Sequence, residues 1–274
     1  MRKNAIGEYI RVGDCDAYVE IMGEGRPLMF FAPAGRDNMH WRDSLRHFSD
    51  RYTCIAVDLP GRGKSTIYSR DLPYLLTDKQ MCDFHYEILK ALGFDEVAVC
   101  GTSMGGTLCY SMAAYYPDLV KVSVPVQGSI NRPLMRRPAL EYLIHPHNNI
   151  MHGMADNMGS LIGRRCTDEG REFLEDTLPY TNPRALHADL VAFVETDLSD
   201  VQHQIKAPTL AIAGTDDWLM NKEVLEKTIA DMPEGLDITY HPLDQLGHFV
   251  HLERPDEFFG AVDPFLATHY PAGG

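Results

Sequence analysis

The sequence predicts an α/β fold in which a mostly parallel sheet of eight strands is flanked by helices and carries an inserted helical cap. Short apolar runs rich in β-branched residues alternate with segments of helical apolar spacing from about residue 27 to residue 126. This alternation stops at 129–199, a stretch rich in Pro and Met with short apolar helical faces. We therefore predict a core made of 1–128 and 200–274 and a cap made of 129–199.

The first half of the chain supplies six of the predicted strands. The first two flank Gly13-Asp14 and should form a hairpin. A helix with Trp41 follows the third strand, and Thr77-Asp78-Lys79-Gln80 is a capping box that opens a helix ended by Gly93. Another helix follows the fifth strand and ends at Pro117. The six strands are expected at 9–12, 17–22, 27–31, 52–57, 96–100 and 119–126.

Strand and helix patterns return after the predicted cap. The apolar run 209–213 should be a buried strand, a helix is expected at 222–230, and a last strand at 237–240. The final helix should begin after Pro255, and Pro264 is expected to bend it because proline has no N–H to donate. The alternation favours a parallel α/β sheet over a sandwich.

Composition and charge limit the kinds of molecule with which the protein is expected to interact. The 274 residues are 45% hydrophobic and 23% charged, as in a globular domain, and the net charge of −14 argues against a nucleic-acid or anionic-membrane partner. No apolar run has membrane-spanning length, no signal peptide is evident, and six cysteines show no Cys-x-x-Cys spacing. We expect a cytoplasmic protein that acts on a small molecule and needs no cofactor or metal; a homo-oligomer is compatible with the sequence.

The chemistry is expected around Ser103. It lies in Gly101-Thr102-Ser103-Met104-Gly105, between an apolar run and a helical segment. Glycines beside a serine at a strand-to-helix junction form a nucleophile elbow, a sharp turn that exposes the hydroxyl. A serine hydroxyl needs a base to take its proton and a carboxylate to orient that base. The strand 209–213 leads to Asp216 and Asp217, and His248 follows the last strand.

These motifs resemble the α/β-hydrolase-fold enzymes with a helical cap, over nearly the whole chain apart from the cap. The resemblance implies Ser103 as nucleophile, His248 as base and Asp217 as acid, with Asp216 as the alternative acid. Members usually carry His-Gly after the third strand, where this sequence has Ala32-Pro33. Proline has no N–H, so the oxyanion donors map to the amides of Ala34 and Met104, the latter just after the nucleophile.

A serine nucleophile narrows the range of possible reactions, because the similar dehalogenases and epoxide hydrolases use a carboxylate as nucleophile. Cleavage of a small, largely apolar carboxylic ester ranks first. Hydrolysis of a C–C bond ranks second: the elbow is similar to that of meta-cleavage-product hydrolases, which commonly have Asn at the position of Thr102 and often Trp at that of Phe249. A ligand receptor with negligible turnover is the alternative from another class.

The substrate pocket is expected between sheet and cap. We predict contacts from Trp218, Phe249, Met154 and Met158, because methionines make adaptable apolar walls. The methionines could equally fill the cap's own core, and Trp218 could pack under the pocket.

Three further patterns have alternative interpretations. Gly63-Lys64-Ser65 matches the end of a phosphate-binding loop, but Asp58 stands where its first glycine belongs. In the resembling family, the segment from Asp58 to Ser65 shapes a loop. A metal site could involve the cap histidines, although clear ligand spacing is missing. His251 is a weaker base candidate, and His85 is expected to pack within a helix. The cap histidines are His145, His147 and His152.

Overall fold

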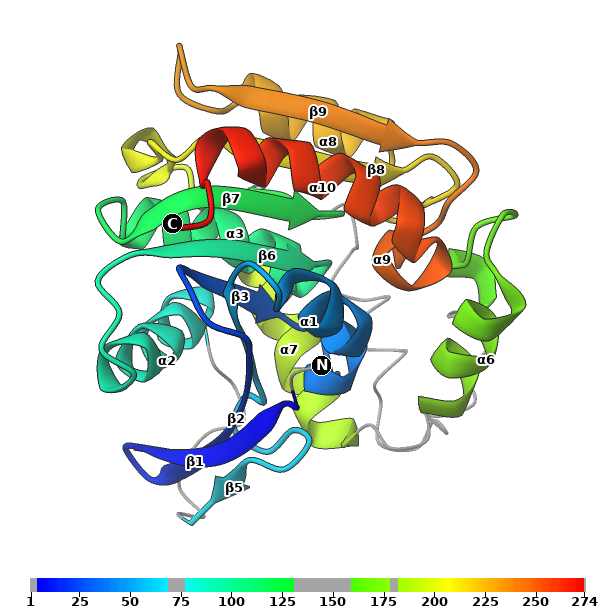
Figure 1. Cartoon of the computed structure of the whole chain (residues 1–274). Helices are drawn as coiled ribbons and strands as arrows, with labels where there is room; N and C mark the ends of the chain where they lie inside the picture. Colours follow the sequence, from blue (N-terminus) through cyan, green and yellow to red (C-terminus); the bar gives the residue numbers. More distant parts are fainter. Residues whose placement is uncertain (1–3, 69–76, 131–158, 178–181, 274) are drawn as a thin grey trace.

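The computed structural model describes residues 4–68, 77–130, 159–177 and 182–273 (Figure 1). In this part of the chain, a nine-stranded sheet has the order β1-β2-β4-β3-β6-β7-β8-β9, and β5 pairs with β2. The pairs from β4 to β9 are parallel, whereas β1, β2 and β5 pair in antiparallel fashion. The predicted α/β fold with a mostly parallel sheet is confirmed.

All eight predicted strands are present, with ends shifted by a few residues. The ninth, β5, has two residues, too few for a pattern in the sequence. The strands are β1 (Ile6–Val12), β2 (Cys15–Met22), β3 (Pro27–Phe31), β4 (Thr53–Val57), β5 (Thr66–Ile67), β6 (Val97–Thr102), β7 (Val120–Val126), β8 (Thr209–Gly214) and β9 (Ile238–Leu243).

Helices cover both faces of the sheet (Figure 1). Side chains of α1 and α10 pack against one face, and those of α2, α3 and α8 pack against the other. The described helices are η1 (Asn38–Trp41), α1 (Arg42–Phe48), α2 (Asp78–Ala91), α3 (Met104–Tyr115), α6 (Asp168–Thr177), α7 (Pro183–Glu195), η3 (Gln202–Gln204), α8 (Lys222–Ala230), α9 (Val250–Glu253) and α10 (Pro255–His269).

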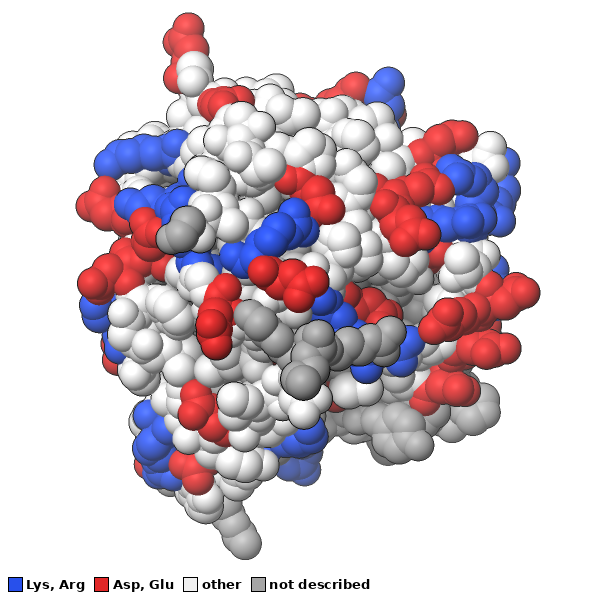
Figure 2. All heavy atoms as spheres, viewed as in Figure 1, with Lys and Arg blue, Asp and Glu red and all other residues white. Residues whose placement is uncertain are grey.

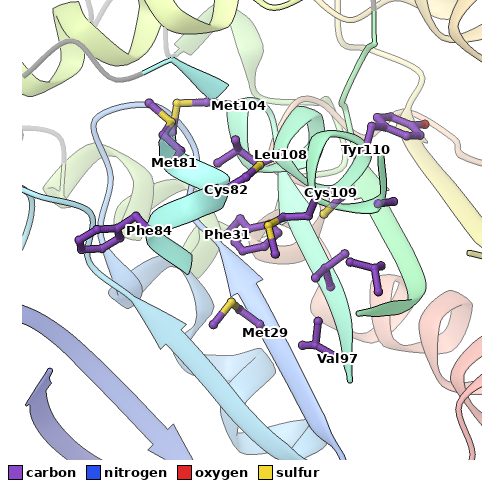
Figure 3. Packing of buried hydrophobic residues seen from close by; sticks show 14 of the residues in the cluster. Met29, Phe31, Met81, Cys82, Phe84, Val97, Met104, Leu108, Cys109 and Tyr110 are labelled. Atoms are coloured by element: carbon purple, nitrogen blue, oxygen red, sulfur yellow. The ribbon is translucent and has the colours of Figure 1, made fainter. Parts of the chain in front are cut away.

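Buried strand β3 shows how the sheet forms two cores. Its side chains alternate between the faces, as the two-residue period of a strand requires. Leu28 and Phe30 pack with α1 and α10, whereas Met29 and Phe31 pack with α2 and α3. Figure 3 shows part of this second core, where Phe31 and Met29 lie near residues of α2 and α3. The sheet is therefore buried on both faces around the nucleophile elbow.

Local signals in the sequence correspond to the observed turns and caps. Gly13 lies in the β1–β2 turn with a φ of 56°. Thr77 Oγ1 accepts from the amide of Gln80 at 3.2 Å, and Gln80 Oε1 accepts from the amide of Thr77 at 3.0 Å, so the capping box is confirmed. Helix α10 continues across Pro264 as one element.

Two described helices come from the predicted cap. Helix α6 packs against α9, and α7 packs against α3. In Figure 1, α6 lies near α9, beyond the ends to which the arrows of β7, β8 and β9 point. Helix α6 of the predicted cap therefore lies at the edge of the sheet where a parallel α/β fold places its sites. Met154, Met158 and the cap histidines lie outside the described residues.

Surface charge and helix length both bear on the prediction that nucleic acids and membranes are not partners. On the face in Figure 2, Lys and Arg are interspersed with Asp and Glu, and α6 adds a group of acidic residues. Among the described helices, none is long and apolar enough to cross a membrane.

All six cysteines are free thiols, and five are buried. Burial raises the pKa of the Cys15 thiol to about 11 and raises that of Cys54 and Cys100 further. The expectation that Cys54 and Cys100 lie in core strands is confirmed.

Candidate active site

Ser103 occupies the turn between β6 and α3. Its backbone has φ 60° and ψ −121°, a conformation that is costly for a residue with a side chain and that recurs at functional sites. The turn is held on both sides, because the Ser103 amide donates to Val126 O at 2.9 Å and its carbonyl accepts from the Thr107 amide at 2.9 Å. The side chain is largely buried. This is the geometry of the predicted elbow.

Glycines allow the three segments at the elbow to approach closely. A Cβ on Gly101 would lie 2.2 Å from Gly105 O, and a Cβ on Gly105 would lie 2.1 Å from Phe31 O. Neither atom could be accommodated without moving backbone. The beginning of α3 therefore sits directly against the end of β3, where the predicted oxyanion loop begins.

The two predicted oxyanion donors lie in the two segments that meet at this junction, since Ala34 follows β3 and Met104 begins α3. In the described part of the chain, the N–H groups of Ala34 and Met104 donate no hydrogen bond. Ala34 lies in a turn closed by a 3.1 Å bond from the Arg36 amide to Pro33 O, in which Gly35 has φ 71°. A type II turn needs positive φ at that position.

The Met104 side chain turns away from this junction. It packs in the same buried cluster as Met81 of α2, and Figure 3 shows the two thioethers near each other. Only the backbone of Met104 is therefore left for the site.

Asp217 and His248 form a buried pair. Asp217 Oδ2 lies 2.5 Å from His248 Nδ1, and both side chains are almost fully buried. The second carboxylate oxygen accepts from the amides of Leu219 at 2.8 Å and Met220 at 3.2 Å. An ionised carboxylate only accepts hydrogen bonds, so the proton of this pair lies on Nδ1 and Nε2 remains an acceptor.

Asp216, the alternative acid, is directed elsewhere. Its carboxylate accepts from Arg164 Nε at 2.9 Å, from Arg164 Nη2 at 2.8 Å and from the Arg164 amide at 3.0 Å. These bonds lower the pKa of the Asp216 carboxyl. The structure therefore brings Asp217, and not Asp216, to His248.

The sheet places the three predicted residues at one edge. Ser103 follows β6, Asp217 follows β8 and His248 follows β9, and these strands run in the same direction. Gln127, after β7, ties the loops together, since its Nε2 donates to Gly214 O at 3.1 Å and to Gly247 O at 3.2 Å. In the described residues, the Ser103 hydroxyl makes no hydrogen bond, so its contact with His248 belongs to the proposal below.

Glu253 holds the loop that carries His248. Its carboxylate is fully buried and accepts from the amides of Gly247 at 2.8 Å, Phe249 at 3.0 Å and Gly163 at 2.9 Å. Burial raises the pKa of the Glu253 carboxyl, and the three amides oppose that shift. The sequence interpretation missed this residue, although an acidic residue directly after the apolar Leu252 was an available signal.

A second buried acid, Asp189, connects helix α7 of the predicted cap to the turn after β3. Asp189 of α7 forms a buried ion pair with Arg62, and its Oδ2 accepts from the Gly35 amide at 2.7 Å. Burial raises the pKa of the Asp189 carboxyl, while the Arg62 guanidinium lowers it. Asp189 therefore connects the cap, the loop after β4 and the turn that contains Ala34. The sequence interpretation also missed this connection.

Comparisons with known proteins agree with this architecture. A family model described as alpha/beta hydrolase fold matches residues 27–137. The enol-lactonase from Burkholderia xenovorans superposes with a TM-score of 0.82 at 21% identity, covering 94% of this chain and 99% of that one. The chain has the α/β-hydrolase fold.

Curated relatives of this chain differ in the reactions for which they are named. The (E)-2-((N-methylformamido)methylene)succinate hydrolase of Acinetobacter baylyi is 27% identical over 253 residues, covering 90% of this chain and 92% of the relative. Epoxide hydrolase 4 of Mus musculus is 24% identical over 287 residues, covering 94% and 79%. Both relatives are named as hydrolases but for different reactions, so the comparisons do not identify a substrate for this chain.

The four predicted pocket residues have different surroundings in the structure. Trp218 is 55% exposed, and its indole N–H donates to Ser160 Oγ at 3.2 Å. The alternative that Trp218 packs under the pocket is therefore wrong. Phe249 is buried in a cluster formed by α6, α9 and Leu161, so it packs cap against core. Met154 and Met158 lie outside the described residues.

The structure also bears on the predicted alternatives for the phosphate-binding loop, His85, His251 and a metal site. Residues directly after Ser65 form strand β5, so the helix that a phosphate-binding loop requires does not follow. His85 is buried, with its Nδ1 2.7 Å from Met81 O, which confirms its packing role. Burial, followed by the charge of His248, lowers the pKa of His251 to about 3. His251 lies 3.1 Å from Thr102 Oγ1 and stays neutral. In the described residues no metal-binding group was found.

Proposed function

We propose that this chain is a serine hydrolase that cleaves a small, largely apolar carboxylic ester through an acyl-enzyme. The observation that carries the proposal is the 2.5 Å contact between His248 Nδ1 and Asp217 Oδ2, at the sheet edge where Ser103 occupies a strained elbow. Perturbed backbone at a serine and a buried His–Asp pair are both costly to maintain, and acyl transfer uses both.

In the proposed reaction, His248 Nε2 takes the hydroxyl proton of Ser103 while the serine oxygen bonds to the ester carbonyl carbon. The imidazolium then gives this proton to the leaving alkoxide oxygen as the C–O bond breaks. Water attacks the acyl-enzyme with His248 again as base, which releases the carboxylic acid and restores the serine. Asp217 orients the imidazole and stabilises its charged form.

The amides of Ala34 and Met104 are proposed to bind the oxyanion of both tetrahedral intermediates. Both amides lack a partner within the described residues. Met104 begins α3, and Ala34 follows the end of β3, against which the start of α3 packs. A donor of this kind typically contributes about 10²–10³-fold in rate. Because these donors are backbone groups, only a substitution by proline would remove an N–H directly.

The serine at the elbow is the reason to rank esters above epoxides, despite the epoxide hydrolase relative. The resemblance described above places a carboxylate nucleophile in epoxide hydrolases. The neighbour titled enol-lactonase is consistent with ester chemistry, since a lactone is a cyclic ester. Hydrolysis of a C–C bond is the second candidate, favoured by the string Gly101-Thr102-Ser103-Met104-Gly105-Gly106.

Two assays test the proposal. Purified protein is assayed with short-chain 4-nitrophenyl esters and with a vinylogous diketone, beside the variants Ser103→Ala and Ser199→Ala. Ser199 is exposed and remote from the elbow in sequence, so its variant is the matched control. We expect Ser103→Ala to lose ester hydrolysis and Ser199→Ala to retain it. Faster turnover of the diketone would favour the C–C reaction.

A fluorophosphonate probe separates an enzyme from a receptor. An activated Ser103 should be labelled within minutes, whereas a serine without a working base should react poorly. The site is identified by mass spectrometry of the labelled peptide. Wild-type hydrolysis by the Ser103→Ala variant, or labelling at another serine, would refute the proposal.

A further inference from the structure

The loop that carries His248 is held through three consecutive backbone amides. The amides of Gly247 and Phe249 donate to the buried carboxylate of Glu253. The amide between them, that of His248 itself, donates to Leu161 O at 2.8 Å. Leu161 belongs to the predicted cap. The backbone of the proposed base is therefore fixed partly from the core and partly from the predicted cap.

This contact extends along residues 161–167, directly before α6, which we call the cap segment. The Gly163 amide donates to Glu253 Oε2 at 2.9 Å, and the same oxygen accepts from the Gly247 amide at 2.8 Å. Two further amides of the cap segment donate at 3.1 Å each, and these bonds are Arg165 N–H to Gln245 O and Thr167 N–H to Glu253 O. The cap segment therefore follows the loop of His248 and the helix after it over several residues.

Two facing glycines let the cap segment and this loop lie backbone against backbone. A Cβ on Gly163 would lie 2.4 Å from Gly247 N and 2.6 Å from Gln245 O. A Cβ on Gly247 would lie 2.1 Å from Leu161 O. Neither glycine has a positive φ, so the residue type is required by space and not by backbone conformation. The atoms in the way are backbone, which cannot turn aside as the end of a side chain can.

The cap segment also reaches the loop of Asp217, but through exposed groups. The side chain of Arg164, which pairs with Asp216, is 73% exposed. Trp218, which donates to Ser160 just before the cap segment, is 55% exposed. An exposed ion pair contributes little to stability. The buried contacts of the cap segment therefore bear on His248.

We propose that Leu161 and Gly163 are positioning residues for His248, so that part of the predicted cap sets where the base lies relative to Ser103. The inference rests on the proposed ester hydrolysis, in which His248 takes the proton of Ser103. Asp217 fixes the imidazole at Nδ1, and Leu161 O fixes the backbone of the same residue. A shift of that backbone must either stretch the bond to Asp217 or move Nε2 away from the serine.

The test inserts one methyl group into this contact. In Gly163→Ala the two backbones must separate, because the new Cβ would start 2.4 Å from Gly247 N. Gly159→Ala is the matched control, since it makes the same change at an exposed glycine whose Cβ would have no neighbour within 4 Å in the described part of the chain. With 4-nitrophenyl butyrate, we expect kcat to fall by about 10–10²-fold in Gly163→Ala and KM to stay within about threefold of wild type. Gly159→Ala should keep both values.

A measurement without substrate separates positioning from general stability. Proton–nitrogen correlation spectra of protein with isotope-labelled histidine show, through the carbon-bound ring protons, which ring nitrogen carries a proton. The variant His248→Gln assigns the signals. At a pH where the ring is neutral, wild type and Gly159→Ala should show His248 protonated at Nδ1, because Asp217 accepts from that nitrogen. Gly163→Ala should show a mixture of the two tautomers.

A second variant covers the case in which Gly163→Ala does not fold. Leu161→Ala keeps the carbonyl acceptor but removes the side chain that packs with Phe249 and Leu252. It should lower kcat by about three- to tenfold, because the cap segment is held less firmly. The control is Leu236→Ala, a partly buried leucine before β9 that packs in another cluster, and it should keep the wild-type kcat.

The outcomes distinguish failure of this inference from failure of the proposed reaction. If Gly163→Ala and Leu161→Ala melt earlier than wild type but keep kcat and the wild-type tautomer of His248, the cap segment supports the fold alone and the inference is overturned. If wild type cleaves no tested ester, or Ser103→Ala remains active, the proposed reaction fails and the spectra decide. A tautomer mixture in Gly163→Ala or Leu161→Ala that the matched control lacks then supports positioning, and unchanged spectra overturn it.

Discussion

Replacement of Glu253 should leave His248, the proposed base, in the site but position it less firmly. Three buried amides donate to this carboxylate, and two of them, from Gly247 and Phe249, flank His248. In Glu253→Gln, the single carbonyl oxygen can keep the Gly163 and Gly247 bonds, while the amide of Phe249 meets an NH₂ group. One unsatisfied buried donor costs about 1–3 kcal/mol. Glu253→Ala leaves all three without a partner and should cost roughly 3 kcal/mol or more.

The assay combines thermal unfolding with steady-state kinetics. For a chain of this size, each kcal/mol corresponds to roughly 2–4 °C in Tm, so both variants should melt earlier, with Ala below Gln. At a temperature where every variant is folded, we expect kcat to fall by up to about 10²-fold, since small displacements of a catalytic group have effects of that order. KM should change less, because the Glu253 carboxylate is fully buried and bonded to backbone amides.

The matched control is Glu257→Gln in the adjacent helix. Glu257 pairs with Arg165 at the surface, and such a pair contributes about 0–1 kcal/mol. This variant should retain both Tm and kcat. If Glu253→Gln behaved like Glu257→Gln, the idea that the buried carboxylate positions His248 would be wrong. A fall in Tm with unchanged kcat would leave Glu253 a role in folding only.

Three further expectations follow from the buried acids. Asp217→Asn should lower kcat for ester hydrolysis by about 10⁴-fold, whereas Asp216→Asn should leave kcat close to wild type; equal effects would contradict the observed pairing. Asp189→Asn should lower the free energy of unfolding in urea by about 3–5 kcal/mol, because Arg62 is left charged and buried. The exposed Asp200→Asn is the control and should lose less than about 1 kcal/mol. A loss that small for Asp189→Asn would contradict this expectation. Burial raises the pKa of Asp58 from 3.8 to about 6, so the folded state binds this proton more tightly than the unfolded state. The Asp58 contribution to stability should therefore decrease as pH rises from about 4 to about 6; urea unfolding of wild type and Asp58→Asn across this window checks the sign.

The fold was accessible from the sequence because its signals are local. Apolar strands, the capping box at Thr77 and the glycines around Ser103 each act within a few residues, and the structure places each of them as predicted. Asp217 and His248 were also accessible, since each follows a strand and parallel strands end at one edge. The choice between Asp216 and Asp217 depended on Arg164, a residue of the cap.

The sequence did not reveal the residues whose role depends on hydrogen-bond partners far away in the chain. Asp189 accepts from an amide 154 positions away, and Glu253 accepts from one 90 positions away. A pattern within a helix reveals that such a residue is acidic, but not which backbone group it meets. Strand β5 was too short for any periodic signal.

The reactivity of the buried thiols can be used to measure local opening of the structure. Alkylating reagents attack the thiolate, and burial both covers five of the sulfurs and raises their pKa. Modification of Cys100 in β6 or Cys109 in α3 therefore requires the elbow region to separate transiently. Timed alkylation followed by peptide mass spectrometry would measure how often that separation occurs, residue by residue, without any introduced label.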